Sequence, residues 1–173
     1  IVHTDMSSPW IARLGTDAQK ARYLPGIISG DTICALAITE PGAGSDMAGL
    51  ETRAQRDGGD WLISGSKTFT TNGVNGDLYL VAARSREHGP RHQQLSQFIV
   101  EKSSPGLTVT KKLRKTGMWT SDTAELRLDN VRVPSENLVG EEGRGFYQMA
   151  DGLQRERLMA AILSVSASQQ AIE

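Results

Sequence analysis

Short runs of strand-forming residues, separated by turn residues, fill the middle of the chain as far as Val133. No long helical segment lies between them. The expected strands are residues 32–39, 51–57, 61–67, 78–84, 97–101, 107–113 and 124–133. A parallel sheet needs a long crossover, usually a helix, between successive strands, and this segment has none. The pattern therefore predicts an antiparallel β-barrel or sandwich.

Local patterns support individual strands. Leu126 and Leu128 alternate with charged residues, and Leu107 and Val109 alternate with threonines, as in strands with one buried face. The Asp-Gly-Gly-Asp sequence at 57–60 lies between two such runs. It predicts a β-hairpin.

Helices are expected on both sides of the strands. Ser8 with Pro9 predicts a helix start, and Gly15 a stop. Thr16 and Gln19 have the spacing of a capping box, and the helix that follows is expected to end at Pro25-Gly26.

A glycine-rich hinge at 140–145 precedes a long helix that is expected from Phe146 onward. The predicted fold class is α+β. The predicted order is helices at 1–30, a β domain at 31–140 and a long helix within 141–173.

Composition excludes several classes of function. The 173 residues have a net charge of −1, so no basic surplus indicates a nucleic-acid partner. No apolar run is long enough to predict a membrane span. Cys34 is the single cysteine, which excludes an internal disulfide and a cysteine-based zinc cage and favours a reducing compartment. Because the chain begins at Ile1 and ends within a helical pattern, we expect it to be an excerpt.

The segment 36–46 is the first candidate site. A strand runs into a Pro/Gly turn that contains two hydroxyl groups and lets a ligand approach the backbone. It is not a dinucleotide fingerprint, because Met47 stands at the third glycine position, and it is not a P-loop. The structural alternative is a tight β-turn.

The segment 67–73 is the second candidate. Its three threonines flank Phe69, so it could contact a planar ring and the polar edge of that ring, and Asn72-Gly73 predicts a turn with positive φ. The alternative is an ordinary strand, since threonine is a common strand residue.

Glu156 is the third candidate. Met149, Leu153, Ala160 and Leu163 lie on the same expected helix face, so the carboxylate is predicted to sit on an apolar stripe. Desolvation there would raise the pKa of Glu156 toward the range of a general base. The alternative is a buried salt bridge to an arginine.

No metal site is predicted. His3, His88 and His92 show no metal-ligand spacing and are expected to be solvated, and Cys34 is expected in the core.

The motifs, in this order, resemble the acyl-CoA dehydrogenase family, most closely its long-chain type. The matching strings are AITEPGAGSD at 37–46, GSK at 65–67, TNG at 71–73, FIVE at 98–101, LRKTG at 113–117, DTAEL at 122–126, NLVG at 137–140 and GRGF at 143–146. The resemblance covers essentially the whole chain. It implies that residues 1–30 are the end of an N-terminal helical domain, 31–140 a middle β domain and 141–173 the start of a C-terminal helical domain.

The resemblance implies a flavoenzyme whose FAD ring lies between the β domain and the C-terminal helices. The positions that match flavin-contacting residues are Leu36, Ala37, Ile38, Thr39, Gly44, Ser45, Phe69, Thr70 and Thr71. Thr39 and Thr71 would hydrogen-bond the polar edge of the ring, and Ser45 would serve both flavin and thioester. Many members have Trp where this chain has Phe69, so the indole donor is lost.

The implied reaction is α,β-dehydrogenation of an acyl-CoA, in which a base removes the α-proton and the β-hydrogen leaves as hydride to the flavin. Long-chain and isovaleryl-type members carry the base in an LxxERL pattern, which LQRERL at 153–158 matches, so Glu156 is the predicted base. The predicted substrate-binding residues are Ser45, His92, Gln93, Tyr147, Gln154, Arg155 and Arg157.

The resemblance also implies an electron-transfer flavoprotein as the electron acceptor and a homotetramer. An acyl-CoA oxidase and an inactive scaffold of the same fold are the alternatives. The compartment, bacterial cytoplasm or mitochondrial matrix, is left open.

Overall fold

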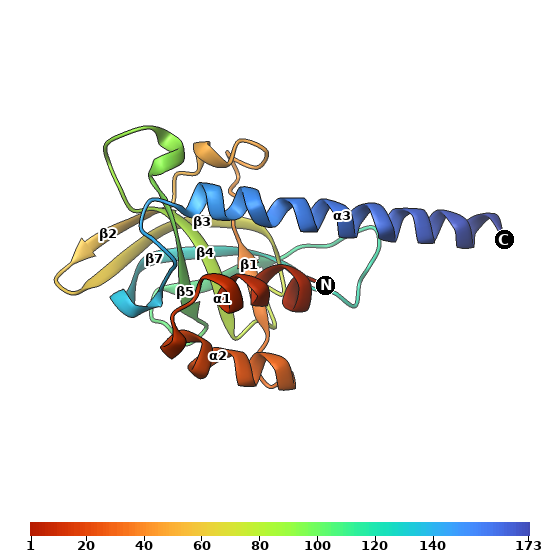
Figure 1. Cartoon of the computed structure of the whole chain (residues 1–173), viewed down its shortest axis with the longest axis horizontal. Coiled ribbons are helices and arrows are strands. Elements are labelled where there is room, and N and C mark those ends of the chain that lie inside the picture. Colours follow the sequence, from red (N-terminus) through yellow and green to blue (C-terminus); the bar gives the residue numbers. More distant parts are fainter.

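The computed structural model describes residues 1–173 and has a central β-sheet with helices packed against it. The helices are η1 (Val2–Ser7), α1 (Ser8–Leu14), α2 (Asp17–Ser29) and α3 (Gly145–Ile172), with short 3₁₀ turns η2 (Met47–Gly49), η3 (Arg91–Gln93) and η4 (Ser135–Asn137). In Figure 1, α3 crosses the body and continues beyond it. No helix is long and apolar enough to cross a membrane.

Eight strands form one sheet, and the α+β class is confirmed. The strands are β1 (Cys34–Ala37), β2 (Arg53–Asp57), β3 (Asp60–Thr71), β4 (Leu78–Arg84), β5 (Leu95–Glu101), β6 (Leu107–Lys112), β7 (Thr123–Pro134) and β8 (Leu138–Val139). Their order is β6-β7-β3-β2-β4-β5-β8, with β1 beside β4. Each sequence-predicted strand is present, and β8 is an addition.

The expectation of a purely antiparallel sheet is wrong. β1 pairs with β4 in parallel from Cys34↔Leu78 to Ala37↔Val81, and β2 meets β4 in parallel at Arg53↔Arg84. The β2–β3 hairpin lies between β1 and β4 in the chain, so the connection is long enough to serve as the crossover that a parallel pair requires. The sheet is therefore mixed.

The predicted hairpin at 57–60 is confirmed. Asp57 pairs with Asp60 across the turn, and Gly58 has a φ of 61°. The alternation of β7 is also confirmed, because Leu126 and Leu128 are buried. β6 differs: as an edge strand it leaves Val109 exposed, and the predicted buried face is realised only in part.

The sheet buries side chains on both faces, which makes two cores. Along β4, Tyr79 and Val81 belong to a core that is formed by strand residues on one face of the sheet. In this core Trp61 and Phe98 meet edge to face, with ring centroids 5.2 Å apart. The intervening Leu80 belongs to a second core shared with the helices. A strand that is apolar from Leu78 to Ala83, as β4 is, fits a place where both faces are covered.

The helix α2 begins as predicted and ends later. The capping box forms, since the amide of Gln19 donates to the Thr16 hydroxyl and the amide of Thr16 donates to the Gln19 side chain. The predicted end at Pro25-Gly26 is wrong. Pro25 is exposed, the next turn buries Ile27 in the core, and Gly30 ends the helix at a φ of 84°. Burial of Ile27 outweighs the hydrogen bond that proline removes.

The N-terminal segment also departs from expectation. The helix α1 continues directly from η1, and the Ser8 hydroxyl donates to the carbonyl of Thr4 instead of capping a new helix. His3 is not solvated. The amide of Cys34 donates to His3 Nδ1 at 3.0 Å, so Nε2 carries the proton and donates to the carbonyl of Ile27 at 3.0 Å. Cys34 is buried as predicted, and burial raises the pKa of its thiol to about 11.

The helix α3 is fixed to the body through its first half. Met149 is fully buried, and Gly152 lies so close to Trp10 that an added Cβ would stand 2.6 Å from the indole nitrogen. Arg13 and Asp151 form an exposed ion pair at 2.7 Å beside this contact. Glycine at 152 thus lets α3 approach α1, and this approach sets the position of the next turn, which carries Glu156.

Replacement of Gly152 by alanine tests this contact. In an exposed helix the change would stabilise by about 1 kcal/mol, whereas here the clash with Trp10 is expected to destabilise by about 1–3 kcal/mol. The measurement is equilibrium unfolding of the full-length protein. Gly59→Ala is the control, because no atom lies within 4 Å of a Cβ added there. A stabilised Gly152→Ala protein would contradict the packing.

Candidate functional site

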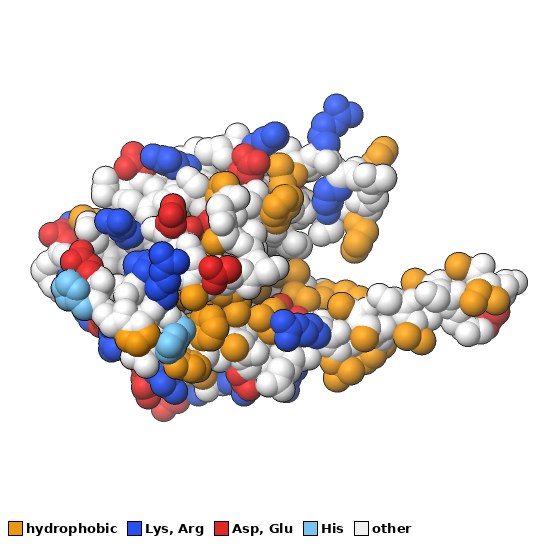
Figure 2. All heavy atoms as spheres, turned by 90° about the horizontal axis from the view of Figure 1, so that it is seen from above, with side chains coloured by type: hydrophobic (Ala, Val, Ile, Leu, Met, Phe, Trp, Pro, Cys, Tyr) orange, Lys and Arg blue, Asp and Glu red, His pale blue; other side chains and the backbone are white.

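Most of the predicted cofactor-binding residues meet, together with Glu156 and Arg157, in a cleft of about 450 Å³. The cleft lies between η1, the end of β1, the turn after it, the end of β3 and α3. Figure 2 shows hydrophobic side chains gathered where α3 leaves the body. The cleft is lined by Val2, Met6, Leu36, Ile38, Thr39, Gly44, Ser45, Met47, Phe69, Thr71, Leu153, Glu156 and Arg157. Residues from four distant parts of the sequence therefore share one surface.

Glu156 is the one carboxylate in this cleft. Its Oε1 atom is buried and has no hydrogen-bond partner, and burial raises the pKa of the carboxyl group. The alternative of a buried salt bridge is not realised in this chain, where Glu156 forms no ion pair. A buried polar atom without a partner is rare in proteins and is commonly explained by function.

The apolar stripe around Glu156 is only half formed. Met149 is buried and Leu153 is partly buried, but Ala160 and Leu163 are exposed. The predicted stripe is covered only up to Glu156, because α3 leaves the body directly after this residue. The carboxylate therefore stands at the boundary between the packed and the free half of the helix.

Phe69 stands out from the sheet at the edge of the cleft. The pairing of β3 with β7 shifts register between Lys67 and Thr70, and Phe69 adopts a φ of 53°. Its side chain is 67% exposed. A β-bulge redirects side chains in this way, and such bulges are common beside binding sites. Asn72, with a φ of 61°, shows the turn geometry that its sequence predicted.

Two predicted cofactor-binding residues point away from the cleft. Ala37 and Thr70 are buried and do not line it. The bulge that turns Phe69 outward turns Thr70 inward, where its hydroxyl has no partner. These two residues can contribute only through their backbone.

A buried ion pair fixes the turn that carries Thr39 and Ser45. Lys67 Nζ lies 2.7 Å from Glu40 Oε1, and both side chains are almost completely buried. The Glu40 carboxylate also accepts the amides of Glu51 at 2.6 Å and Thr52 at 3.0 Å. One carboxylate thus joins the start of the turn, its end and β3.

The same pair orients the residues that flank Glu40. Lys67 Nζ donates to the carbonyl of Ile38 at 2.9 Å, and the amide of Thr68 donates to the carbonyl of Thr39 at 2.8 Å. Burial lowers the pKa of Lys67 to about 8, although Glu40 opposes this shift. Burial would raise the pKa of Glu40, but the charge of Lys67 and its hydrogen bonds together lower it.

An aromatic cluster forms a second predicted contact region. The His92 ring lies 6.1 Å from Phe146 and 5.8 Å from Tyr147, and Arg144 stacks on Tyr147 at 4.5 Å. His92 and Tyr147, predicted from distant segments, are therefore neighbours. They do not line the cleft of Glu156, and neither do the exposed Gln93, Gln154 and Arg155. No group of three or more His, Cys, Asp or Glu side chains is arranged to bind a metal.

Comparisons with known proteins place this arrangement in a family. The model of the acyl-CoA dehydrogenase middle domain matches residues 35–131, and that of the N-terminal domain matches residues 1–31. The chain belongs to the acyl-CoA dehydrogenase family. The division at residues 30 and 140 stays a prediction.

Individual relatives agree. The chain is 45% identical to the long-chain specific acyl-CoA dehydrogenase of Rattus norvegicus, over 96% of this chain and 39% of that protein. It is 39% identical to the isovaleryl-CoA dehydrogenase of Pongo abelii, over 92% of this chain and 38% of that protein. The crystal structure of an acyl-CoA dehydrogenase from Geobacillus kaustophilus superimposes with a TM-score of 0.91 at 46% identity, covering 93% of this chain and 43% of that one. The chain thus spans about two fifths of these relatives.

Four lining residues of the cleft were not among the predicted site residues: Val2, Met6, Met47 and Leu153. Leu153 belongs to the apolar helix face that the sequence predicts around Glu156. Val2 and Met6 reach the cleft from η1, and Met47 reaches it from η2. The first two are apolar residues that come close only through the fold, so no local pattern indicates them. Met47 follows the Pro/Gly turn directly, and that proximity was the available signal.

A double-mutant cycle tests the role of the Glu40–Lys67 pair. Lys67→Met leaves a buried carboxylate unpaired and is expected to cost about 3–5 kcal/mol of unfolding free energy. Glu40→Gln combined with Lys67→Met is expected to cost clearly less than the sum of the single changes. The measurement is denaturant unfolding of the full-length protein.

Arg13→Met is the matched control for that cycle. It breaks the exposed pair with Asp151 and is expected to cost less than about 1 kcal/mol. Additive costs at positions 40 and 67 would show that the two side chains do not depend on each other.

Proposed function

We propose that the full-length protein catalyses FAD-dependent α,β-dehydrogenation of an acyl-CoA thioester to the trans-2-enoyl-CoA. The observation that carries the proposal is the buried, unpartnered Oε1 of Glu156 in a cleft whose other polar side chains include Thr39, Ser45 and Thr71. A carboxylate that is desolvated and free of partners is suited to accept a proton from carbon. The family relatives support the class of reaction.

The cleft fits a flavin ring in its chemistry. Leu36, Ile38 and Met47 supply apolar surface for the face of a planar ring, and Thr39 and Thr71 supply hydroxyl groups for its polar edge. Gly44 leaves room beside the backbone, since an added Cβ would meet only a methyl group of Thr39, at 3.9 Å. We assign the ring to this surface. When bound, FAD supplies the acceptor for the hydride that leaves the β-carbon.

Glu156 would remove the proton from the α-carbon of the thioester. The ionised carboxylate is desolvated, so protonation relieves an unfavourable state and strengthens the base. The Ser45 hydroxyl, which lines the same cleft, would donate a hydrogen bond to the thioester and stabilise negative charge that develops on its carbonyl oxygen. Arg157 lies beside Glu156 at the mouth of the cleft.

The remaining predicted substrate residues would bind the CoA portion. His92 and Tyr147 form the neighbouring aromatic cluster, and Gln93 adjoins His92 on η3. Gln154 and Arg155 are exposed on α3 and would contact the ligand from that side. The aromatic cluster lies outside the cleft of Glu156, which suits a long substrate that reacts at one end.

We also propose a homotetramer that passes its electrons to an electron-transfer flavoprotein. The free half of α3 exposes Leu158, Ile162 and Leu163. An exposed row of apolar side chains is typical of a surface that is buried by further helices or by another subunit. Sedimentation analysis of the full-length protein tests the assembly, and hydrogen peroxide formation without a response to electron-transfer flavoprotein would favour an oxidase instead.

Glu156→Gln in the full-length protein tests the proposed base. The variant is expected to keep its yellow flavin and to bind acyl-CoA, but to lose flavin reduction by several orders of magnitude, because the amide cannot accept the proton. Stopped-flow absorbance of the flavin measures this. The control is Asp151→Asn, an isosteric loss of charge one and a half turns earlier on α3. Near-normal reduction in Glu156→Gln would place the base elsewhere.

The raised pKa of Glu156 gives a pH dependence with a definite sign. The base acts in its ionised form, so the rate of flavin reduction is expected to fall as pH drops through a pKa above the ordinary value of 4.5. The folded state holds this proton more tightly than the unfolded state, so ionisation of Glu156 lowers stability at neutral pH. Glu156→Gln is therefore expected to unfold at a higher temperature than the wild type at pH 7. A lower unfolding temperature would contradict the desolvation argument.

A further inference from the structure

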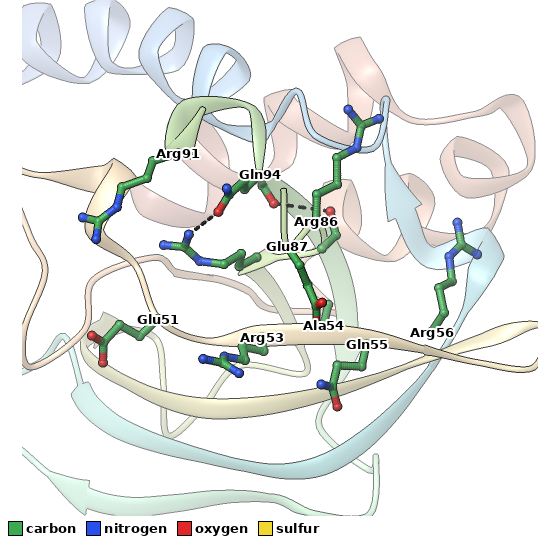
Figure 3. Close-up of a pocket in the computed structure, with 11 residues that line it drawn as sticks. Glu51, Arg53, Ala54, Gln55, Arg56, Arg86, Glu87, Arg91 and Gln94 are labelled. Carbon is green, nitrogen blue, oxygen red and sulfur yellow. Dashed lines mark hydrogen bonds between the residues drawn. The ribbon is translucent and has the colours of Figure 1, made fainter. Parts of the chain in front are cut away.

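A second, larger hollow lies between β2 and the loop that joins β4 to β5. It measures about 1020 Å³, and five of its eleven lining residues are arginines: Arg53, Arg56, Arg84, Arg86 and Arg91. Figure 3 shows Arg53 alongside β2 and Arg91 descending from the loop above it. Glu51 and Glu87 are its only acidic residues, in a chain whose net charge is −1. The positive charge is thus concentrated locally.

Three of these arginines already have partners. Arg84 donates to the carbonyl of Leu50 at 2.8 Å and to the side chain of Gln94. Arg56 and Arg86 both contact Glu142, at 3.1 Å and 3.6 Å. These contacts fix the walls of the hollow, and Glu142 is the one carboxylate among the partners of the three arginines.

Arg53 and Arg91 have no partner within the chain. Neither forms an ion pair or a side-chain hydrogen bond, and Glu51 and Glu87 are not within ion-pair distance of them. Two free guanidinium groups therefore face one hollow from opposite walls. This donor arrangement suits phosphate groups, which arginine binds through paired N–H donors.

The arginine hollow adjoins the candidate active site through two chain segments. The segment that supplies Ser45 and Met47 to the cleft of Glu156 continues to Glu51 and Arg53 in the arginine hollow. On η3, Arg91 lines the arginine hollow, while the next residue, His92, packs against Tyr147 of α3. A long ligand held at the cleft and at His92 can therefore reach Arg91 with its far end.

We propose that Arg53 and Arg91 bind the phosphate groups of the CoA portion of the substrate. This inference rests on the proposed function, because it takes the reactive end of the thioester to lie at Glu156. The concave shape and the facing donors fit a small, multiply charged ligand. An acidic protein surface would instead require a broad, flat area of positive charge, which a chain of this composition does not supply.

The test uses the full-length protein and the double variant Arg53→Gln, Arg91→Gln. Both side chains are exposed, so the variant is expected to fold. Calorimetric titration with CoA is expected to show binding about 10-fold to 100-fold weaker than in the wild type, as for the loss of two charged hydrogen-bonding groups. The salt dependence of CoA binding is expected to decrease in parallel. Titration needs no flavin reduction, so it gives a result even if the proposed reaction fails.

Kinetics then assign the effect to the phosphates. The double variant is expected to raise KM for an acyl-CoA, to raise it less for the acyl-3′-dephospho-CoA, and to leave KM for the matching acyl-pantetheine and kcat unchanged. Arg132→Gln, which removes the same charge from an arginine paired with Asp57 and Asp60 outside the hollow, is the control.

Several outcomes would overturn the proposal. They are unchanged CoA binding, an equal loss with acyl-pantetheine, or a loss confined to thioesters of an acidic carrier protein, which would indicate a protein partner. If no acyl thioester reduces the flavin of the wild type, the proposed function is wrong. Weaker CoA binding by the double variant would then still support the phosphate site.

Discussion

The Glu40 carboxylate holds together the part of the molecule on which the candidate site depends. It accepts the Lys67 ammonium and two backbone amides from the far end of the turn, so a single group closes the loop between β1 and β2. Two buried charges are costly unless each is fully paired, and here the hydrogen bonds supply that pairing. The turn therefore has one favoured conformation, and Thr39 and Ser45 are positioned before any ligand arrives. Preorganisation of this kind reduces the entropy lost on binding.

Signals that act over a few residues could be predicted from the sequence. The Thr16 capping box, the hairpin at 57–60 and the turn at Asn72 depend on nearest neighbours, and each forms as expected. Contacts between distant segments are harder to predict from the sequence. The parallel pairing of β1 with β4 needs the whole hairpin between them, and the turn of α2 beyond Pro25 depends on the burial of Ile27 against other elements.

The candidate site shows the same division. The spacing around Glu156 indicated a desolvated carboxylate, and the structure buries its Oε1 atom without a partner. The spacing does not show that α3 leaves the body directly after Glu156, which leaves Leu163 exposed. Nor could a strand pattern reveal the bulge that turns Phe69 outward and Thr70 inward, because bulges depend on the register of the partner strand.

Glu40 and Glu156 are two buried carboxylates in opposite environments, one with hydrogen-bond donors around it and one without. Three donors surround Glu40, and its pKa is lowered, so it stays ionised and serves the fold. No donor meets Oε1 of Glu156, and its pKa is raised, so its ionised form remains reactive. The difference comes from position. Glu40 lies where two backbone segments converge, whereas Glu156 lies on a helix, whose own amides are already bonded and can offer it nothing. A helix that crosses an apolar cleft is thus a suitable element to present a base.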